Sequence, residues 1–189
     1  MGSIIVRLYL ERNDNFAGVI LCGAPNYQPA AGFGKKLAQL LVKMKGPKAK
    51  TKLLTALSFG SFSKSVKNAK TPVDWLSYNE ENVQQFLNDE LCGVPFTDVG
   101  NRDLFTMVAH LHHPFTAKNP SLPILFISGE DDPCTGGTLG LVDSISTLQK
   151  NGYANIENIT FPKMRHEILN EKENHLVIEE MIKFINQHQ

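Results

Sequence analysis

The chain has 189 residues, and a hydrophobic fraction of 42% is enough to bury a sizeable core, as one domain or as a core with one insertion. No run approaches the roughly 20 apolar residues of a membrane span, and the first residues lack the order of a signal peptide, so we expect a cytoplasmic protein. The formal net charge is zero, but residues 15–73 hold ten lysines and no acid, whereas residues 74–189 hold seventeen acids against seven lysines and arginines. We therefore expect that the two parts pack against each other or that the basic part faces an anionic surface, such as a membrane, and we expect no nucleic-acid partner.

The first predicted elements are a helix and a buried strand. Within residues 1–12, Ile4, Ile5 and Leu8 recur at helical spacing. Residues 16–23 form a short apolar run that ends in glycine, which is typical of a strand buried on both faces. A helix followed by a strand is the alternation of an α/β fold.

Residues 26–115 break this alternation. Clusters of proline, glycine and serine separate short helical patterns there, and no further strand is predicted. We expect a helical insertion with helices near residues 35–44, 80–91 and 103–110.

Two apolar features of the insertion bear on its role. Its first helix has an apolar stripe flanked by lysines, and this is the composition of an interfacial helix on anionic lipid, or else of an ordinary cap helix with a solvated lysine face. The stripe consists of Leu37, Leu40, Leu41 and Met44. Residues 58–63 and Trp75 place aromatic side chains in loop-like surroundings, where we expect them to anchor the insertion, the alternative being that they line a pocket.

Residues 122–133 are the stretch around which the chain is organised. A short apolar run bounded by Pro123 and Gly129 predicts a parallel strand buried on both faces, and its end opens into an acidic turn. Ligands and catalytic groups of open α/β sheets gather at that edge of the sheet.

The remainder of the chain returns to the α/β alternation. The pattern predicts a helix that ends at Asn151 and an edge strand at residues 156–161. It also predicts a final helix, for which Asn170 and Glu173 are the expected capping pair. The apolar stripe of that helix consists of Val177, Met181, Phe184 and Ile185.

A histidine turn follows the edge strand, as the acidic turn follows the buried one. A serine hydrolase needs a histidine and a buried carboxylate from neighbouring strand ends, and His166 with Asp132 meets that need. Asp131 competes with Asp132 for the role of the acid, and Glu130 is a poorer choice because it lies closest to the strand. The alternative is a solvated acidic loop and a helix-entry histidine.

The cysteines and the other histidines predict neither a metal nor a cofactor. Cys22, Cys92 and Cys134 cannot all pair within the chain and lack metal-ligand spacing, which fits small thiols in a reducing compartment. His110 and His113 lie three residues apart and would share a helical face, but no third ligand at a convincing spacing accompanies them.

In the order of its motifs the chain resembles the α/β-hydrolase superfamily, in particular the serine aminopeptidase S33-like group that includes monoacylglycerol lipases and lysophospholipase-like enzymes. The marks are the strand at residues 18–23, the Gly-x-x-Asp sequence that ends at Asp132, and the Arg-His-Glu sequence around His166. The resemblance implies that Asp132 and His166 are the acid and the base of a Ser-His-Asp triad. It also implies that the backbone N–H of Met1 is one oxyanion donor.

The resemblance further implies the C-terminal part of an α/β-hydrolase fold: parallel strands with flanking helices and a helical cap insertion. Residues 1–25 and 116–189 would form the core, and residues 26–115 the cap or lid. The family's nucleophile lies in Gly-x-Ser-x-Gly, and Met1 falls one position after the expected serine. Ser3 follows the last glycine of that motif and is not expected to be the nucleophile.

We therefore expect a truncated serine hydrolase, inactive as it stands, whose complete form cleaves carboxylic esters of monoacylglycerol or lysophospholipid type without a cofactor. The expected partners are a small ester or lipid substrate, an anionic membrane surface and, along the unpaired edge of the first strand, the missing N-terminal half or a second copy. The alternatives are a peptidase-type member of the same family and a non-catalytic interaction module.

Overall fold

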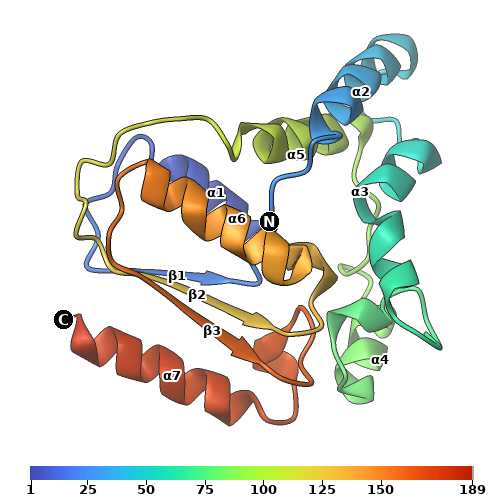
Figure 1. Cartoon of the computed structure of the whole chain (residues 1–189). Coiled ribbons are helices and arrows are strands. Elements are labelled where there is room, and N and C mark those ends of the chain that lie inside the picture. Colours follow the sequence, from blue (N-terminus) through green and yellow to red (C-terminus); the bar gives the residue numbers. More distant parts are fainter. Residues whose placement is uncertain (189) are drawn as a thin grey trace.

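The structure is a computed structural model that describes residues 1–188, and it has an α/β fold (Figure 1). Three parallel strands form one sheet in the order β1 (Val19–Cys22), β2 (Ile124–Gly129) and β3 (Ile156–Phe161). One face of the sheet is covered by α1 (Gly2–Tyr9) and α6 (Gly137–Lys150), and the other by α7 (Asn174–Gln187). The predicted parallel sheet with flanking helices is confirmed.

β2 occupies the centre of the sheet, and all six of its residues are buried. Side chains alternate between the two faces of a strand. Ile124 and Phe126 pack under α1 and α6, whereas Leu125 and Ile127 pack against α7. A strand buried on both faces needs an unbroken apolar sequence, and residues 124–127 provide it.

The two edges of the sheet differ in their surroundings. The three polar residues of β3 are exposed, whereas Ile156 and Ile159 are half-buried and Phe161 is buried, as expected for a strand at the edge of the sheet. β1 pairs with β2 on one side, and within residues 1–188 no strand pairs with its other side. An unpaired strand edge is a template for a further strand.

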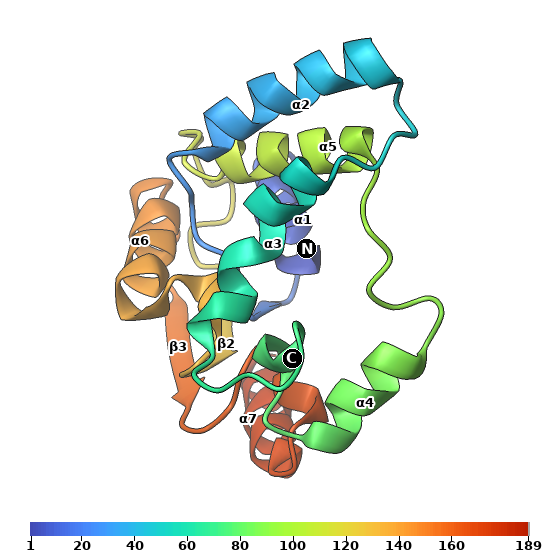
Figure 2. The ribbon, with the colours of Figure 1, turned by 90° about the vertical axis from the view of Figure 1, so that its right-hand side faces the viewer.

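Between β1 and β2 the described chain has helices and no strand, and these helices lie to one side of the sheet (Figure 1, Figure 2). The α-helices are α2 (Ala31–Lys45), α3 (Lys52–Ser65), α4 (Glu80–Asn88) and α5 (Asp98–His110). α2 and α5 cross closely. A β-carbon on Gly34 of α2 would lie only 2.9 Å from the ring of Phe105 on α5, so a glycine is needed at the crossing. The buried carboxylate of Asp98 accepts hydrogen bonds from the N–H and hydroxyl of Thr51, which joins the start of α3 to the start of α5.

Residues 58–63, which we expected in loop-like surroundings, lie within α3. Glycine and serine have modest or low helix propensities, so the local sequence does not predict a helix there. Leu54 on the same helix is fully buried against Ala38 and Phe105. Tertiary packing of the helix therefore outweighs the local preference.

The predicted faces of two helices are also corrected. On α2, Leu40 and Met44 are 54% and 70% exposed, whereas Leu37 and Leu41 are half-buried and pack beside Ala38, so only half of the predicted stripe packs. On α1, Ile5 is exposed, whereas Arg7 is buried and donates a hydrogen bond to the C=O of a proline.

The predicted cap of α7 is wrong. A 3-10 turn, Ile168–Asn170, precedes the helix, so Asn170 lies too far from its first residue to cap it. Glu173 occupies the N-cap position but makes no side-chain cap bond. Within residues 1–188, every helix is too short or too polar to serve as a membrane span.

Candidate active site

The turns that follow β2 and β3 are joined backbone to backbone. The N–H of Glu130 donates to the C=O of Phe161 at 2.8 Å, and the N–H of Asp131 donates to the C=O of Met164 at 3.0 Å. Neighbouring parallel strands end at the same edge of a sheet. These two bonds therefore hold the acidic turn beside the turn that carries His166.

Asp132 and His166 meet at this edge. His166 Nδ1 lies 2.9 Å from Asp132 Oδ2, and the carboxylate is fully buried while the imidazole is 24% exposed. The other carboxylate oxygen accepts the N–H of Cys134 at 2.8 Å and so caps the 3-10 turn Pro133–Thr135. A carboxylate held at both oxygens fixes the orientation of the ring, which leaves Nε2 as the nitrogen for proton transfer. The expected contact between the two side chains is present.

Two glycines permit this close approach. Gly23 has a φ of +52°, and a β-carbon there would lie 3.0 Å from His166 Nδ1 and 3.1 Å from Asp132 Oδ2. A β-carbon on Gly129 would overlap the backbone of Met164. Neither strand end tolerates a side chain without displacing the pair, so the backbone itself sets part of the site's geometry.

The two competing acids point elsewhere. Asp131 is exposed and accepts the hydroxyl of Tyr78 at 2.8 Å, and this hydrogen bond is the main cause that raises the pKa of Tyr78. Glu130 is exposed at the end of the strand. Of the three acids in the turn, only Asp132 contacts the histidine.

Two thiols beside the pair remain protonated near neutral pH. Burial, followed by the negative charge of Asp132, raises the pKa of Cys22 to about 11. The same two causes raise the pKa of Cys134 far above its ordinary value. Because the thiolate is the reactive form of cysteine, neither side chain is suited to act as a nucleophile here.

Glu171 joins the histidine turn to the insertion, a role that the sequence did not reveal. Its buried carboxylate accepts hydrogen bonds from the Ser77 hydroxyl at 2.8 Å and from the N–H groups of Tyr78 at 2.9 Å and Asn79 at 3.1 Å. From the histidine turn it accepts the N–H of Arg165 at 3.0 Å. One carboxylate therefore satisfies donors from two segments that are far apart in the chain.

Arg165 forms the second part of this connection. Its guanidinium donates to the C=O of Asp74 at 2.6 Å and stacks over the ring of Tyr78, 3.8 Å from the centroid. These contacts place Trp75 with its ring centroid 5.4 Å from that of His166. As the one tryptophan of the chain, Trp75 was a visible candidate for a site residue, but no sequence pattern connected it to the histidine.

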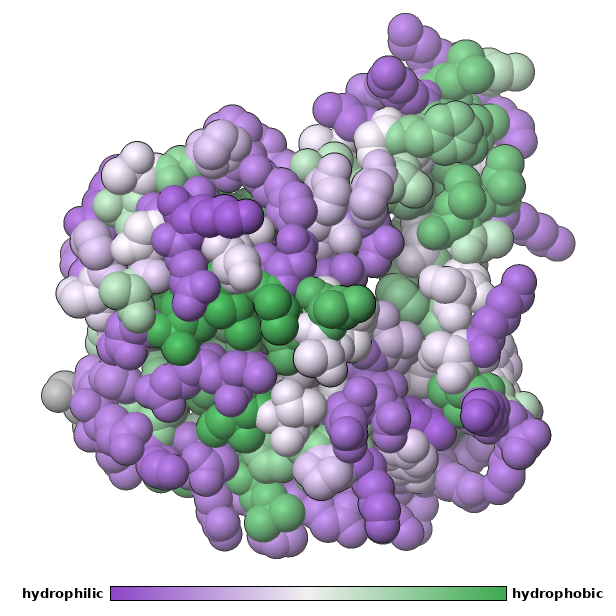
Figure 3. Space-filling view, viewed as in Figure 1, coloured by the Kyte–Doolittle hydropathy of each residue, from purple (hydrophilic) through white to green (hydrophobic). Residues whose placement is uncertain are grey.

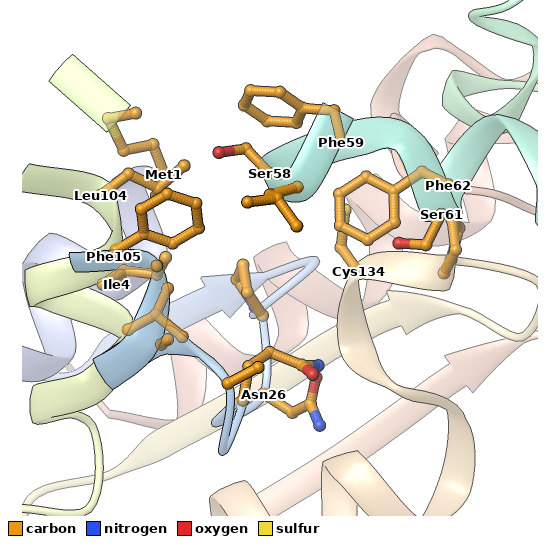
Figure 4. A pocket seen from close by; sticks show the side chains of 18 of the residues that line it. Met1, Ile4, Asn26, Ser58, Phe59, Ser61, Phe62, Leu104, Phe105 and Cys134 are labelled. Atoms are coloured by element: carbon orange, nitrogen blue, oxygen red, sulfur yellow. The ribbon is translucent and has the colours of Figure 1, made fainter. Parts of the chain in front are cut away.

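A cavity of about 460 Å³ opens beside His166, between the sheet edge and the insertion (Figure 4). Phe59 and Phe62 reach it from α3, and Phe105 reaches it from α5. The aromatic residues of its wall are Phe33, Phe59, Phe62, Trp75, Phe96 and Phe105. Its volume is typical of a small-molecule site, whose wall is mostly apolar with a few polar groups. The aromatic side chains of the insertion thus line a pocket, which the sequence left as the alternative.

Two serines lie in the cavity wall, and neither hydrogen-bonds to the histidine. The hydroxyl of Ser58 donates to Asn101 at 2.7 Å, and Ser61 belongs to the same helix. Within the described part of the chain, the ring of His166 has one hydrogen-bonding partner, Asp132. Met1 lies in the wall of the same cavity.

Comparison with known protein families identifies the family of the chain. Residues 1–173 match the model of the family described as serine aminopeptidase, S33. The chain belongs to the serine aminopeptidase S33 family. The resemblance that the motifs indicated is therefore confirmed. No curated protein sequence matches the chain.

The solved structures that share this fold include an esterase and two lipases. A thermostable carboxyl esterase from Bacillus coagulans in complex with glycerol has a TM-score of 0.81 at 24% identity, and a lipase in an open form has 0.80 at 21%. Each comparison covers 98% of this chain and 62% of the other. A monoacylglycerol lipase from Paleococcus ferrophilus has a TM-score of 0.70 at 18% identity, covering 99% of this chain and 65% of the other. This S33 chain thus has part of an α/β-hydrolase fold and spans less than two thirds of the length of these structures.

Proposed function

We propose that this chain carries the acid–base part of a Ser-His-Asp hydrolase, with His166 as the base and Asp132 as the acid that orients it. The observation that carries the proposal is the 2.9 Å contact between a buried carboxylate and an imidazole in the wall of an apolar cavity. Membership of the S33 family supports the same class of reaction.

In the proposed reaction, Nε2 of His166 removes the proton of a serine hydroxyl while the serine oxygen attacks the ester carbonyl. Asp132 accepts the Nδ1–H hydrogen bond and stabilises the imidazolium, which then protonates the leaving alcohol oxygen. Water hydrolyses the resulting acyl-enzyme with the same base. The backbone N–H of Met1 is proposed as one donor to the oxyanion, because Met1 and His166 line the same cavity.

We propose that the nucleophilic serine belongs to polypeptide outside residues 1–188 and that the described chain is inactive without it. The unpaired side of β1 supports this idea, because a parallel strand added there would end at the edge where His166 lies. A second copy of the chain is the other candidate for that position, and light scattering distinguishes the two arrangements.

The proposed substrate is a carboxylic ester with an apolar acyl group. The aromatic wall of the cavity is suited to bind an apolar acyl chain. The names of two structurally similar proteins, a carboxyl esterase and a monoacylglycerol lipase, agree with an ester substrate. An aminopeptidase must also bind a substrate ammonium group. The described residues of the cavity wall include no aspartate or glutamate for that purpose, which favours the ester over the peptide.

We further propose that residues 26–115 form a cap over a core of residues 1–25 and 116–189, and that the cap contacts anionic lipid. Apolar side chains gather over α2 and α3 with hydrophilic ones around them (Figure 3). Phe33 and Leu57 are exposed and also line the cavity, so the apolar surface is continuous with the site. The ten lysines and absence of acids in residues 15–73 supply the charge for an anionic surface.

Hydrolysis of p-nitrophenyl butyrate tests the proposed reaction. The assay compares the polypeptide of residues 1–189 with a longer polypeptide that also contains the residues encoded in frame upstream of Met1. We expect hydrolysis and covalent labelling by a fluorophosphonate only in the version that supplies a serine, with both abolished by His166→Ala. Labelling of the 189-residue chain at one of its own serines would contradict the proposal on the nucleophile. Equal hydrolysis by the His166→Ala variant would contradict the role of the histidine.

Vesicle sedimentation tests the proposed lipid contact. We expect the chain to sediment with anionic vesicles at low salt, less with neutral vesicles, and less after Lys43→Gln and Lys45→Gln together. A matched control is the pair Lys150→Gln and Lys163→Gln on the sheet side of the molecule. Equal recovery with neutral and anionic vesicles would contradict the charge argument.

A further inference from the structure

Glu11, His110 and His113 form a cluster outside the candidate active site. Glu11 follows α1, whereas the two histidines lie at and just beyond the end of α5. His110 Nε2 lies 3.1 Å from one carboxylate oxygen of Glu11, and His113 Nδ1 lies 3.3 Å from the other. The two imidazole rings are nearly parallel, with centroids 4.3 Å apart. The carboxylate is the third ligand that the spacing of the histidines alone did not supply.

The distances in the cluster suit a metal ion. Zinc bonds to histidine nitrogen and carboxylate oxygen are about 2.0 to 2.2 Å, so two ligand atoms on a tetrahedral zinc ion lie about 3.3 Å apart. The contacts of 3.1 Å and 3.3 Å are close to that spacing, and one ligand atom from each side chain lies within 4.8 Å of the other two. To bind one ion, the three atoms would close from within 4.8 Å to about 3.3 Å, and the two stacked rings would turn toward each other.

The backbone holds the three side chains together before any ion binds. The N–H of His113 donates to the C=O of His110 at 2.8 Å, so the chain turns directly after α5. Between them Leu111 is buried in one cluster with Ile4 of α1, and Leu8 near the end of α1 packs against that cluster, so the end of α5 is packed against α1. Side chains positioned in advance reduce the entropy lost on binding.

We propose that Glu11, His110 and His113 bind a divalent first-row transition metal ion, for which Zn²⁺ is the reference. Imidazole and carboxylate ligands suit such ions, and three protein ligands leave a fourth position to water. The ion would join the end of α1 in the sheet region to the end of the last helix of the insertion. It would therefore stabilise the junction between the two parts, independently of any hydrolysis.

Isothermal titration calorimetry with zinc chloride tests the site in the 189-residue chain. The titrations use a His166→Ala background, because Asp132, Cys134 and His166 form a second group with close ligand atoms. We expect one zinc ion per chain. His110→Ala, His113→Ala or Glu11→Gln should each weaken binding by about tenfold or more, since even loss of an outer hydrogen-bonding partner costs about 10- to 100-fold in metal affinity.

The control variant is His175→Ala, which removes an exposed histidine from α7 and should leave the affinity unchanged. Imidazole NMR signals of the parent chain supply a measurement that needs no variant. Zinc should shift the signals of His110 and His113 and leave that of His175 in place. Equal affinity in the His166→Ala chain with and without His110→Ala, or zinc-induced shifts that spare both histidines, would overturn the proposal.

Discussion

The sheet and the insertion bury their apolar residues to very different extents. On β2, Leu125 and Ile127 have no exposed surface, and the strand is covered on both faces. On α2, by contrast, Leu40 and Met44 lie largely in solvent. The packed face of that helix consists of Ala38, with Leu37 and Leu41 half-buried beside it. The sheet is thus a close-packed framework, whereas the insertion leaves several large apolar side chains in solvent, as do the outer faces of α6 and α7.

This difference separates two tasks. The framework fixes the distance between Asp132 and His166, on which the orientation of the imidazole ring depends. The insertion shapes the cavity and presents its apolar surface outward. The two parts meet around the histidine turn at Glu171 and Arg165, and they meet again where Leu111 of the insertion is buried in one cluster with Ile4 of α1. Hydrogen bonds and apolar packing therefore both couple them. The predictions below test this division, from the largest effect to the smallest.

The largest effect is expected at the acid of the proposed triad. In the form of the protein that hydrolyses p-nitrophenyl butyrate, Asp132→Asn should lower kcat by about 10⁴-fold, because the amide favours the wrong histidine tautomer. Asp131→Asn is the matched control and should change kcat only a few-fold, since that side chain contacts Tyr78 instead. A damaging Asp131→Asn beside a mild Asp132→Asn would reverse the assignment within the acidic turn.

The second effect contrasts the two regions in stability. Leu125→Ala should lower the free energy of unfolding by about 2 to 5 kcal/mol, because it leaves a cavity in a close-packed core. Leu40→Ala, the same substitution at an exposed position of α2, should stay within about 0.5 kcal/mol. Urea unfolding followed by circular dichroism measures both. Similar losses from the two variants would mean that the insertion packs more tightly than its surface indicates.

The third effect concerns the connection between the regions. Glu171→Gln should cost about 1 to 3 kcal/mol, because an amide cannot satisfy every donor around the buried carboxylate. The loss should be local, with faster amide hydrogen exchange in residues 74–79. Glu173→Gln, at an exposed position, is the control and should alter neither quantity. Unchanged exchange in residues 74–79 of the Glu171→Gln variant would show that other contacts hold the insertion in place.

The smallest effect is a pH dependence at Asp14 in the sheet region. Burial raises the pKa of Asp14, but hydrogen bonds from the N–H groups of Asn119 and Lys118 and from the hydroxyl of Tyr153 outweigh it, so the pKa is lowered overall. Its contribution to stability is therefore fully present above the unfolded value of about 3.9 and is lost as the pH falls through the folded pKa.

Urea unfolding between pH 5 and pH 2 measures this contribution. Asp14→Asn should reduce the slope of the free energy of unfolding against pH. The reduction should be less than about 1.4 kcal/mol per pH unit, which is the slope produced when unfolding takes up one whole proton. Asp89→Asn, an exposed control on the insertion, should leave the dependence as it is. An unaltered slope in the Asp14→Asn variant would show that other carboxylates dominate acid unfolding.

The sequence predicted the sheet better than the insertion, for a physical reason. A strand buried on both faces requires a continuous apolar run, so β2 was readable from residues 124–127 alone. The helix over residues 58–63 was not readable, because its stability comes from contacts such as that of Leu54 with Phe105, which the local sequence does not contain. The start of α7 was misplaced for a similar reason, since an intervening 3-10 turn leaves no pattern of its own.

The candidate site was predictable only where it depends on strand order. Asp132 and His166 follow neighbouring strands, so topology brings them together. The contacts of Trp75 and Glu171 join segments that no periodicity relates, and the sequence therefore gave no reason to connect them with the histidine. The same limit hid Glu11 from the pair of histidines at the end of α5.

Because Gly129 has no β-carbon, the acidic turn and the histidine turn can pack directly against each other. The α-carbon of Gly129 lies against the backbone of Met164 and Arg165, so the two turns touch through main-chain atoms that cannot be compressed. Hydrogen bonds from Glu130 and Asp131 prevent the same turns from separating. Because contacts and hydrogen bonds hold the acidic turn and the histidine turn from both sides, we expect the two turns to move together. A rearrangement of the insertion that pulls on the histidine turn would therefore carry the acid along with the base and preserve the distance between them.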